Sequence, residues 1–187
     1  MDIYHNKYRP DSVRLQEWDY ASGGYYFITI CTKEKKCTLG TIHNNEIQLS
    51  EVGKIVNRYL LEIPAHFPKT KTDVCVVMPN HVHAILIIED SVETRHGVSL
   101  RDPVSLRDPA PTKNEFSKPI SGSLPVIINQ YKSSVKRWCN KNDHSDFEWQ
   151  KLYYEHIIRD EKELYNVRKY VCYNHLNWEA DKLNTTD

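Results

Sequence analysis

Two histidines in the segment VVMPNHVHAILII, residues 76–88, have the spacing of a metal site. On a β-strand, residues two apart share a face, so His81 and His83 project side by side while Val82 points the other way. Neutral imidazole is the commonest protein ligand for divalent transition metals. Burying two imidazoles in so apolar a run also costs free energy unless a partner satisfies them. The alternative is a pair of histidines bonded only to backbone or solvent.

The other ligands must come from elsewhere, since no cysteine or acidic residue adjoins the pair in sequence. In KYVCYNHLNW, residues 169–178, Tyr170 and Asn174 are four apart and therefore share one face of a helix. A phenol with a free pKa of about 10 is a weak nucleophile until a metal or a base activates it. A divalent ion bound to a phosphate oxygen would assist such an attack. The alternative here is an amphipathic helix with tyrosines at its rim.

The elements that must position these residues alternate between strands and helices. We expect strands at 25–32, 73–77, 81–89 and, with its approach, 147–159, and a hairpin over 37–50 that turns at Asn44-Asn45. Helices are expected after the N-caps Ser50, Ser123 and Asp160, ending near Pro64, Trp138 and Trp178. This order predicts an α+β domain, an antiparallel or mixed sheet with helices packed on one face.

Length and composition bound the class of protein. The 187 residues are 40% hydrophobic, which suits one domain spanning 1–187. There is no apolar run long enough for a membrane helix, so we expect a soluble, cytoplasmic protein with no membrane partner. Five scattered cysteines indicate buried or incidental thiols. Equal numbers of acidic and basic residues, 25 each, argue against coating duplex DNA by bulk charge.

One segment interrupts the pattern. Residues from about 90 to 122 are rich in Ser, Pro, Arg and Asp and contain the tandem copy VSLRDPVSLRDP at 98–109. Such a weakly apolar duplication predicts a mobile insert outside the core.

A basic helix is the candidate DNA surface. The segment NQYKSSVKRWCNK, residues 129–141, carries Lys132, Lys136, Arg137 and Lys141, with Tyr131 and Trp138 interleaved. Phosphate-tracking cations interleaved with stacking aromatics are typical of single-strand binding. A solvated charged face is the alternative. Arg159 is a further cation that could neutralise a phosphate or pair with nearby acids.

Two motifs resemble a known family. MPNHVHAILI, residues 78–87, resembles the His-hydrophobic-His (HUH) motif of the single-tyrosine, IS200-like transposases. WQKLYYEHIIRDEKELYNVRKYVCYNHLNW, residues 149–178, resembles the C-terminal signature of their REP-associated tyrosine transposase branch. The resemblance spans about 25–178, apart from the insert.

The resemblance implies a ferredoxin-like antiparallel sheet flanked by helices. It implies that His81 and His83 are metal ligands, that Tyr170 is the nucleophile and that Asn174 is a candidate third ligand. The activity would be cleavage and rejoining of single-stranded DNA through a 5′-phosphotyrosine link, with magnesium or manganese. The partner would be single-stranded or hairpin DNA, and the protein would be a monomer or a homodimer.

Three other functions stay open at this point. The first is a host-adopted protein that binds hairpin DNA with little or no turnover. The second is a small metallohydrolase that uses the histidine pair to activate water. The third is a plasmid relaxase or replication initiator, although these usually have longer catalytic domains.

Overall fold

A four-stranded antiparallel sheet forms the centre of the protein. The computed structural model describes residues 3–4, 7–8, 23–89 and 120–184. The strands lie in the order β6 (Thr70–Val77), β7 (His81–Ile88), β3 (Gly24–Cys31) and β8 (Tyr154–Ile158). Every neighbouring pair is antiparallel. The two central strands, β3 and β7, are therefore covered by strands on both sides.

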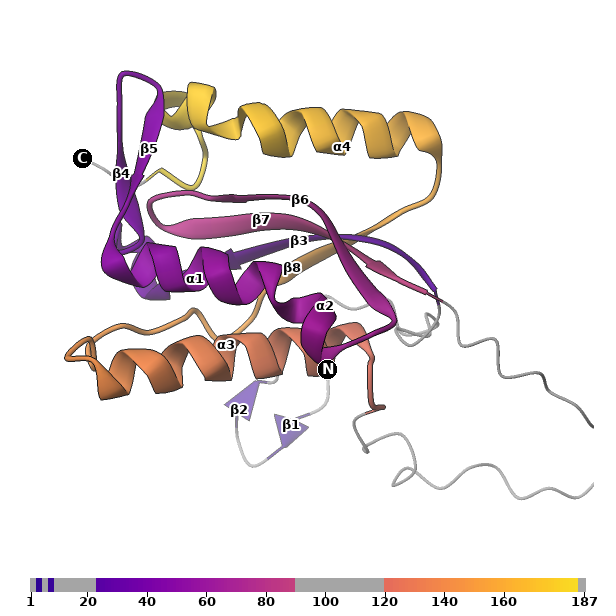
Figure 1. The fold of residues 1–187 in the computed structure, drawn as a ribbon, viewed down its shortest axis with the longest axis horizontal. Helices are drawn as coiled ribbons and strands as arrows, with labels where there is room; N and C mark the ends of the chain where they lie inside the picture. The colour runs from indigo at the N-terminus through magenta and orange to yellow at the C-terminus, as the bar shows by residue number, and fades with distance from the viewer. Residues whose placement is uncertain (1–2, 5–6, 9–22, 90–119, 185–187) are drawn as a thin grey trace, which may run out of the picture.

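Helices lie on both faces of this sheet. The helices α1 (Glu51–Leu61) and α3 (Leu124–Lys141) lie on one face, and α4 (Glu161–Tyr173) lies on the other (Figure 1). The order β3, α1, β6, β7, α3, β8 with this strand arrangement is the ferredoxin-like fold, so the expected fold class is confirmed. The expectation that all helices pack on one face is wrong. The side chains on both faces of β7 are buried, so both faces have a covering layer.

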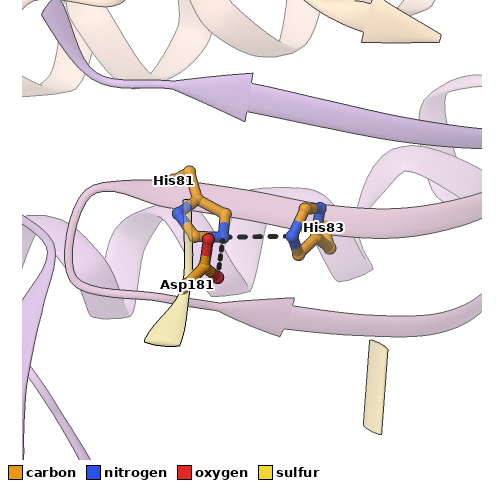
Figure 2. A group of neighbouring side chains, drawn as sticks. All are labelled: His81, His83 and Asp181. Atoms are coloured by element: carbon orange, nitrogen blue, oxygen red, sulfur yellow. Dashed lines mark hydrogen bonds and ion pairs between the residues drawn. The ribbon is translucent and has the colours of Figure 1, made fainter. Parts of the chain in front are cut away.

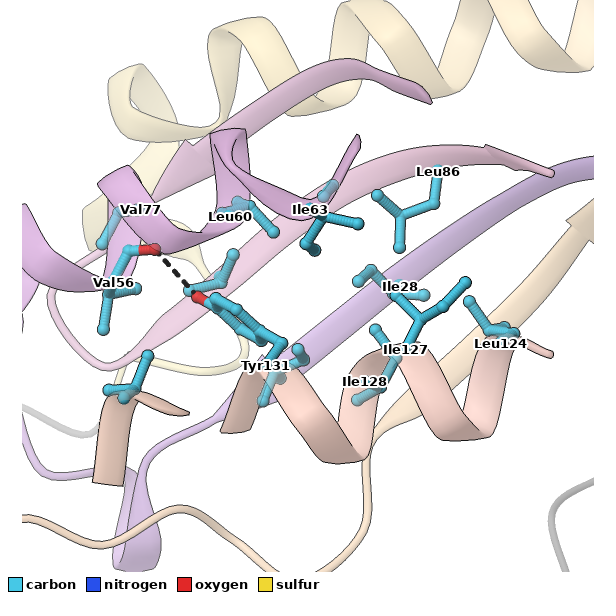
Figure 3. Packing of buried hydrophobic residues seen from close by; sticks show 14 of the residues in the cluster. Ile28, Val56, Leu60, Ile63, Val77, Leu86, Leu124, Ile127, Ile128 and Tyr131 are labelled. Carbon is cyan, nitrogen blue, oxygen red and sulfur yellow. Dashed lines mark hydrogen bonds between the residues drawn. The ribbon is translucent and has the colours of Figure 1, made fainter. Parts of the chain in front are cut away.

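The larger core lies between the sheet and the pair α1 and α3. Strand residues such as Ile28 and Leu86 interdigitate there with Leu60 of α1 and Ile127 of α3 (Figure 3). Tyr131 crosses this layer and donates its hydroxyl hydrogen to the Val56 carbonyl at 3.1 Å. Burial of apolar surface in a layer of this kind is the dominant favourable contribution to folding.

The opposite face has a much smaller apolar cluster. Phe27, Ile85 and Ile158 of the sheet pack against Val171 of α4. The helix is also tied to the sheet edge by Arg168, whose Nε donates to Asp73 Oδ2 at 2.6 Å. Partly buried apolar residues surround this cluster, namely Val74, Val76, Leu164 and Val167.

The expected hairpin forms, but it stands apart from the main sheet. Strands β4 (Gly40–His43) and β5 (Glu46–Leu49) pair only with each other. Asn44 and Asn45 turn the chain with φ values of 51° and 63°, as expected for a tight hairpin. The strands β1 (Ile3–Tyr4) and β2 (Lys7–Tyr8) form another isolated pair.

All three predicted N-caps lie at helix starts, with different partners. The Ser50 hydroxyl accepts from the Gly53 amide, and the Asp160 carboxylate accepts from the Glu163 amide. Ser123 precedes α3, but its hydroxyl donates to the Ile120 carbonyl instead of accepting a helix amide. The Glu163 carboxylate accepts from the Arg159 amide, one residue before the expected position of a capping box.

Several element boundaries differ from those expected. The strand expected over 147–159 is regular only in β8, and Trp149 forms an isolated bridge with Thr32. The first helix ends at Leu61 and is followed by the short α2 (Ile63–His66). The last helix changes at its end into the 3-10 helix η3 (Asn174–Ala180). Almost all of the expected insert, residues 90–119, lies outside the described residues.

Within the described ranges, no helix is both long enough and apolar enough to span a membrane.

Candidate functional site

The two histidines face each other on the α4 side of β7. Their Nε2 atoms are 3.1 Å apart, and the ring centroids are 4.5 Å apart. Both side chains are almost fully buried, with 0% of His81 and 2% of His83 exposed. The expectation that both imidazoles project side by side from one face of a strand is confirmed.

Each outer ring nitrogen has its own partner. The Asn80 carboxamide oxygen accepts from His81 Nδ1–H at 2.7 Å. Its nitrogen donates to the carbonyls of Lys35 and Leu183 at 3.0 and 2.7 Å, which fixes the orientation of the amide. The Thr29 hydroxyl oxygen lies 2.8 Å from His83 Nδ1 and can accept its hydrogen. Such outer partners orient metal-binding imidazoles and leave the Nε2 lone pairs available.

Burial keeps both imidazoles neutral. Desolvation lowers the pKa of His81 to about 3, and the nearby positive charge of Lys35 acts in the same direction. Desolvation also lowers the pKa of His83 to about 3, assisted by His81. Only a neutral imidazole can donate a lone pair to a cation, so the pair is ready to bind a metal at any ordinary pH.

A carboxylate that we did not predict completes a three-residue group. Asp181 Oδ2 lies 3.9 Å from His81 Nε2 (Figure 2). One ligand atom each from His81, His83 and Asp181 lie within 4.8 Å of one another. Asp181 follows η3, about a hundred residues after the histidines, and no local pattern in the sequence marks it. The sequence indicated only that further ligands must come from outside the histidine strand.

The donor set suits a divalent cation. When the Nδ1 atom of each ring carries the hydrogen, the two Nε2 lone pairs face each other at 3.1 Å. They repel each other unless a cation lies between them. That separation is compatible with two nitrogens bound to one ion at about 2.1 Å each. Two imidazoles with a carboxylate are typical of transition-metal sites that also accept Mn²⁺. The residues of this chain therefore fit the group that the family resemblance implies.

Tyr170 lies beside the histidine pair. Its hydroxyl is 3.2 Å from His83 Nε2, and the two ring centroids are 5.1 Å apart. Phe27 supports the tyrosine ring edge-on at 6.0 Å. Burial raises the pKa of the phenol, and the Asp181 charge adds to the effect, so the group is protonated at neutral pH. The side chain is nevertheless 48% exposed and can be approached from solution.

Asn174 caps α4 one turn after Tyr170. Its backbone is still helical, so the predicted four-residue spacing holds even though α4 ends at Tyr173. The side chain is 3% exposed and lowers the phenol pKa slightly. Neither polar atom of its carboxamide has a hydrogen bond of normal geometry. A buried, unsatisfied amide beside a cation site is a candidate ligand.

These residues share one pocket of about 1010 Å³. His83, Tyr170, Asn174 and Asp181 contribute to its wall. The aromatic side chains of Phe27, Tyr153 and Tyr154 also line it, and two lysines contribute charge, Lys35 and Lys182. An open, aromatic pocket with cations is suited to a nucleic-acid strand.

The five predicted DNA contacts do not form one surface. Lys132 Nζ donates to the carbonyls of Gln150 and Lys151, and Lys136 Nζ donates to those of Ser145 and Phe147, so both hold the segment before β8. Arg137 and Trp138 line a different pocket, between α1, α2 and α3. Arg159 lines a shallow pocket that shares Phe27 and Tyr170 with the histidine site. Of the five, Arg159 is the one that lines a pocket together with the tyrosine.

Other tyrosines and histidines lie farther from the centre. Tyr154 is exposed and contacts Phe27 edge-on at 6.4 Å. Tyr173 is exposed on the same helix as Tyr170. His156 Nε2 bonds to Glu163 Oε1 at 2.6 Å, so this histidine has a partner on α4.

Similar proteins were found by sequence and by structure. The chain is 37% identical over 181 residues to an uncharacterized protein of Haemophilus influenzae, covering 97% of this chain and 94% of that protein. It is 23% identical over 156 residues to a second protein of that organism, named "Putative REP-associated tyrosine transposase", covering 83% of this chain and 72% of the other. No family model matches.

Among solved structures, a REP-associated tyrosine transposase bound to a REP hairpin superposes with a TM-score of 0.57. The identity is 15%, and the match covers 88% of this chain and 74% of the other, which shows a shared fold.

The chain has the ferredoxin-like fold of a REP-associated tyrosine transposase of known structure. In sequence it is similar to a protein named as a putative member of that class.

Proposed function

We propose that the protein cleaves and rejoins single-stranded DNA, with Tyr170 as the nucleophile. One observation carries the proposal. The Tyr170 hydroxyl lies 3.2 Å from His83 Nε2, at the edge of a group of potential cation ligands and in an open pocket. A half-exposed phenol next to desolvated imidazoles is an unusual arrangement for a purely structural tyrosine.

The reaction is an exchange of one phosphodiester for another. The Tyr170 oxygen attacks the phosphorus, the bond from phosphorus to the 3′ oxygen breaks, and a 5′-phosphotyrosine forms. The phenol loses its hydrogen as its oxygen bonds to phosphorus, and the released 3′ oxygen gains one hydrogen. Atoms and charge therefore balance. Because the phosphotyrosine link conserves the energy of the phosphodiester bond, a 3′ hydroxyl can attack it and rejoin the strand without ATP.

We propose His81, His83 and Asp181 as ligands of a magnesium or manganese ion, with Asn174 as a further candidate. When bound, the ion would stabilise negative charge on the phosphate oxygens. Asn80 and Thr29 would hold the two imidazole rings in place. Phe27 would hold the Tyr170 ring at the mouth of the pocket.

We also propose that the partner is DNA with a hairpin next to the cleaved strand. The solved structure with the same fold is that of a protein bound to a REP hairpin. We assign the strand to the aromatic pocket wall and to Arg159, which lines a second pocket together with Tyr170. Arg137, Trp138, Lys132 and Lys136 remain predicted contacts for DNA beyond this site.

A denaturing gel tests the function. The protein is incubated with single-stranded DNA from the flanks of its own gene, in manganese, magnesium or chelator. We expect a slow-migrating, nuclease-sensitive adduct that requires metal and is absent from Tyr170→Phe and His81→Ala. Tyr173→Phe changes an exposed tyrosine of the same helix that does not line the pocket, so it is the matched control and should still form the adduct.

Each other outcome identifies a different protein. An adduct in Tyr170→Phe would move the nucleophile to another tyrosine. Cleavage without an adduct, surviving in Tyr170→Phe, would indicate a metallohydrolase. Tight hairpin binding with neither product would indicate a recognition protein without turnover.

A further inference from the structure

A strained turn adjoins the histidine pair. The 3-10 turn η1 (Lys33–Lys35) contains two consecutive residues in the left-handed region, Glu34 with φ of 55° and Lys35 with φ of 53°. Residues other than glycine seldom adopt this conformation. It persists where the surroundings impose it, and such positions concentrate at functional sites.

The turn is attached directly to the ligand support. The Asn80 carboxamide that orients His81 also donates to the Lys35 carbonyl at 3.0 Å. The Thr32 hydroxyl donates to the Lys36 carbonyl at 2.8 Å, which closes the turn from the other side. The backbone of Lys35 is therefore fixed relative to the imidazole pair.

Lys35 contributes to the wall of the site. It is partly buried and lines the pocket that contains His83 and Tyr170. Its positive charge acts on both His81 and Cys31, the residue opposite His81 on β3. The other lysine of this pocket, Lys182, is exposed.

A lysine in this wall can bind one side of an anion whose other side faces a cation at the imidazoles. The Asp181 carboxylate lies on the imidazole side, 3.9 Å from His81 Nε2. A DNA phosphodiester has two non-bridging oxygens, one for each positive group, and an ammonium group forms strong charge-assisted hydrogen bonds with phosphate. Tyr170 lines the same pocket.

We propose that Lys35 binds a non-bridging oxygen of the phosphate that Tyr170 attacks. The inference rests on the proposed function and adds a residue to it. In this proposal the Lys35 side chain contacts the substrate. Its backbone carbonyl, through Asn80, helps to orient His81.

The test measures binding in chelator, so that it depends on neither metal nor turnover. The probe is a single-stranded oligonucleotide from the flank of the gene, in versions with one neutral methylphosphonate at each successive linkage. In wild type we expect neutralisation of one linkage to weaken binding about tenfold, the size of one charge-assisted hydrogen bond. Lys35→Met should be insensitive at that linkage, and its salt slope should be smaller by about 0.7, the value for one single-strand phosphate contact.

Two variants separate the contact from a general effect of charge or folding. Lys182→Met removes the exposed lysine of the same pocket and should keep the wild-type sensitivity at that linkage. Lys35→Arg should restore the salt slope, because it restores the charge. The wild-type adduct gel identifies the cleaved linkage. This should be the same linkage as the one whose neutralisation has an effect that depends on Lys35.

Three results would overturn the inference: no linkage whose effect depends on Lys35, a Lys35-dependent linkage other than the cleaved one, or an unchanged salt slope in Lys35→Met. If wild type forms no adduct, the proposed function fails, and the salt slope alone still decides whether Lys35 contacts a phosphate.

Discussion

The two faces of the central sheet differ in composition although their residues alternate along the same strands. Towards α1 and α3, β7 presents Val82, Ala84 and Leu86 to a large apolar core. Towards α4, it presents His81 and His83 and then Ile85, next to a small apolar cluster. The sheet thus separates the large apolar core on one side from the histidine pair and the small apolar cluster on the other. Substitutions on the two faces should therefore change different properties.

Truncation in the larger core should give the largest effect. Leu86→Ala removes a fully buried side chain from the α1 and α3 face, and we expect it to lower the free energy of unfolding by about 2–5 kcal/mol. Its neighbour Ile87 is half-buried on the other face, so Ile87→Ala should cost about 1 kcal/mol. Urea unfolding followed by circular dichroism measures both. Equal losses would show that the two faces contribute alike.

Metal should stabilise the protein through the α4 face alone. Manganese at a hundredfold excess over its dissociation constant should raise the free energy of unfolding by about 2–3 kcal/mol. His83→Ala should abolish that gain. His156→Ala, which removes a histidine bound to Glu163 on the same face, is the control and should retain it. Thermal unfolding with and without chelator gives the answer, and a gain that survives in His83→Ala would place the ion elsewhere.

Acid should destabilise the metal-free protein through the same pair. Both imidazoles have a pKa of about 3 in the folded protein against 6.5 in the unfolded chain. Below pH 6.5 the unfolded chain binds more protons, so stability is retained above that pH and lost as the pH falls towards 3. At pH 5.5 the loss should be about 1 kcal/mol for each imidazole. His83→Asn should reduce the loss by about half in urea titrations with chelator, and an unchanged pH dependence would contradict the assignment.

The smallest effect should come from the ion pair that ties α4 to the sheet edge. Arg168 and Asp73 are partly exposed, so Arg168→Met should lower the free energy of unfolding by about 0.5 kcal/mol. The exposed neighbour Lys169 serves as control, and Lys169→Met should change nothing measurable. A loss of several kcal/mol in Arg168→Met would mean that α4 depends on this pair more than on its apolar contacts.

The elements of the fold could be predicted because local signals agree. Ser50 and Asp160 cap helices as expected, and Asn44-Asn45 adopts the turn that its composition favours. The strand HVHAILII also fixes the relative orientation of its two histidines, since alternation is a local property. The side of the sheet on which each helix packs is not local, and here the expectation from element order failed for α4.

The site was only partly predictable for the same reason. His81, His83 and Tyr170 belong to motifs, and the structure brings them together. Asp181 and Lys35 carry no motif. Their positions depend on two segments distant in sequence, the strained turn and the chain after η3, which both bond to Asn80. Lys132 and Lys136 read as DNA contacts in sequence, yet their ammonium groups bind backbone carbonyls near β8. Where a lysine points is decided by the tertiary fold.

The long sequence separations within the site have a consequence for synthesis. The Asn80 carboxamide bonds to Leu183 over a separation of 103 residues, and Asp181 joins the histidines from the same late segment. A nascent chain that has emerged only through α3 already carries the histidine strand but has neither the tyrosine nor the carboxylate. On the proposed function, the protein cannot cut a DNA strand while it is still being translated up to residue 181. Release of a competent enzyme is thereby coupled to synthesis of its last structural segment.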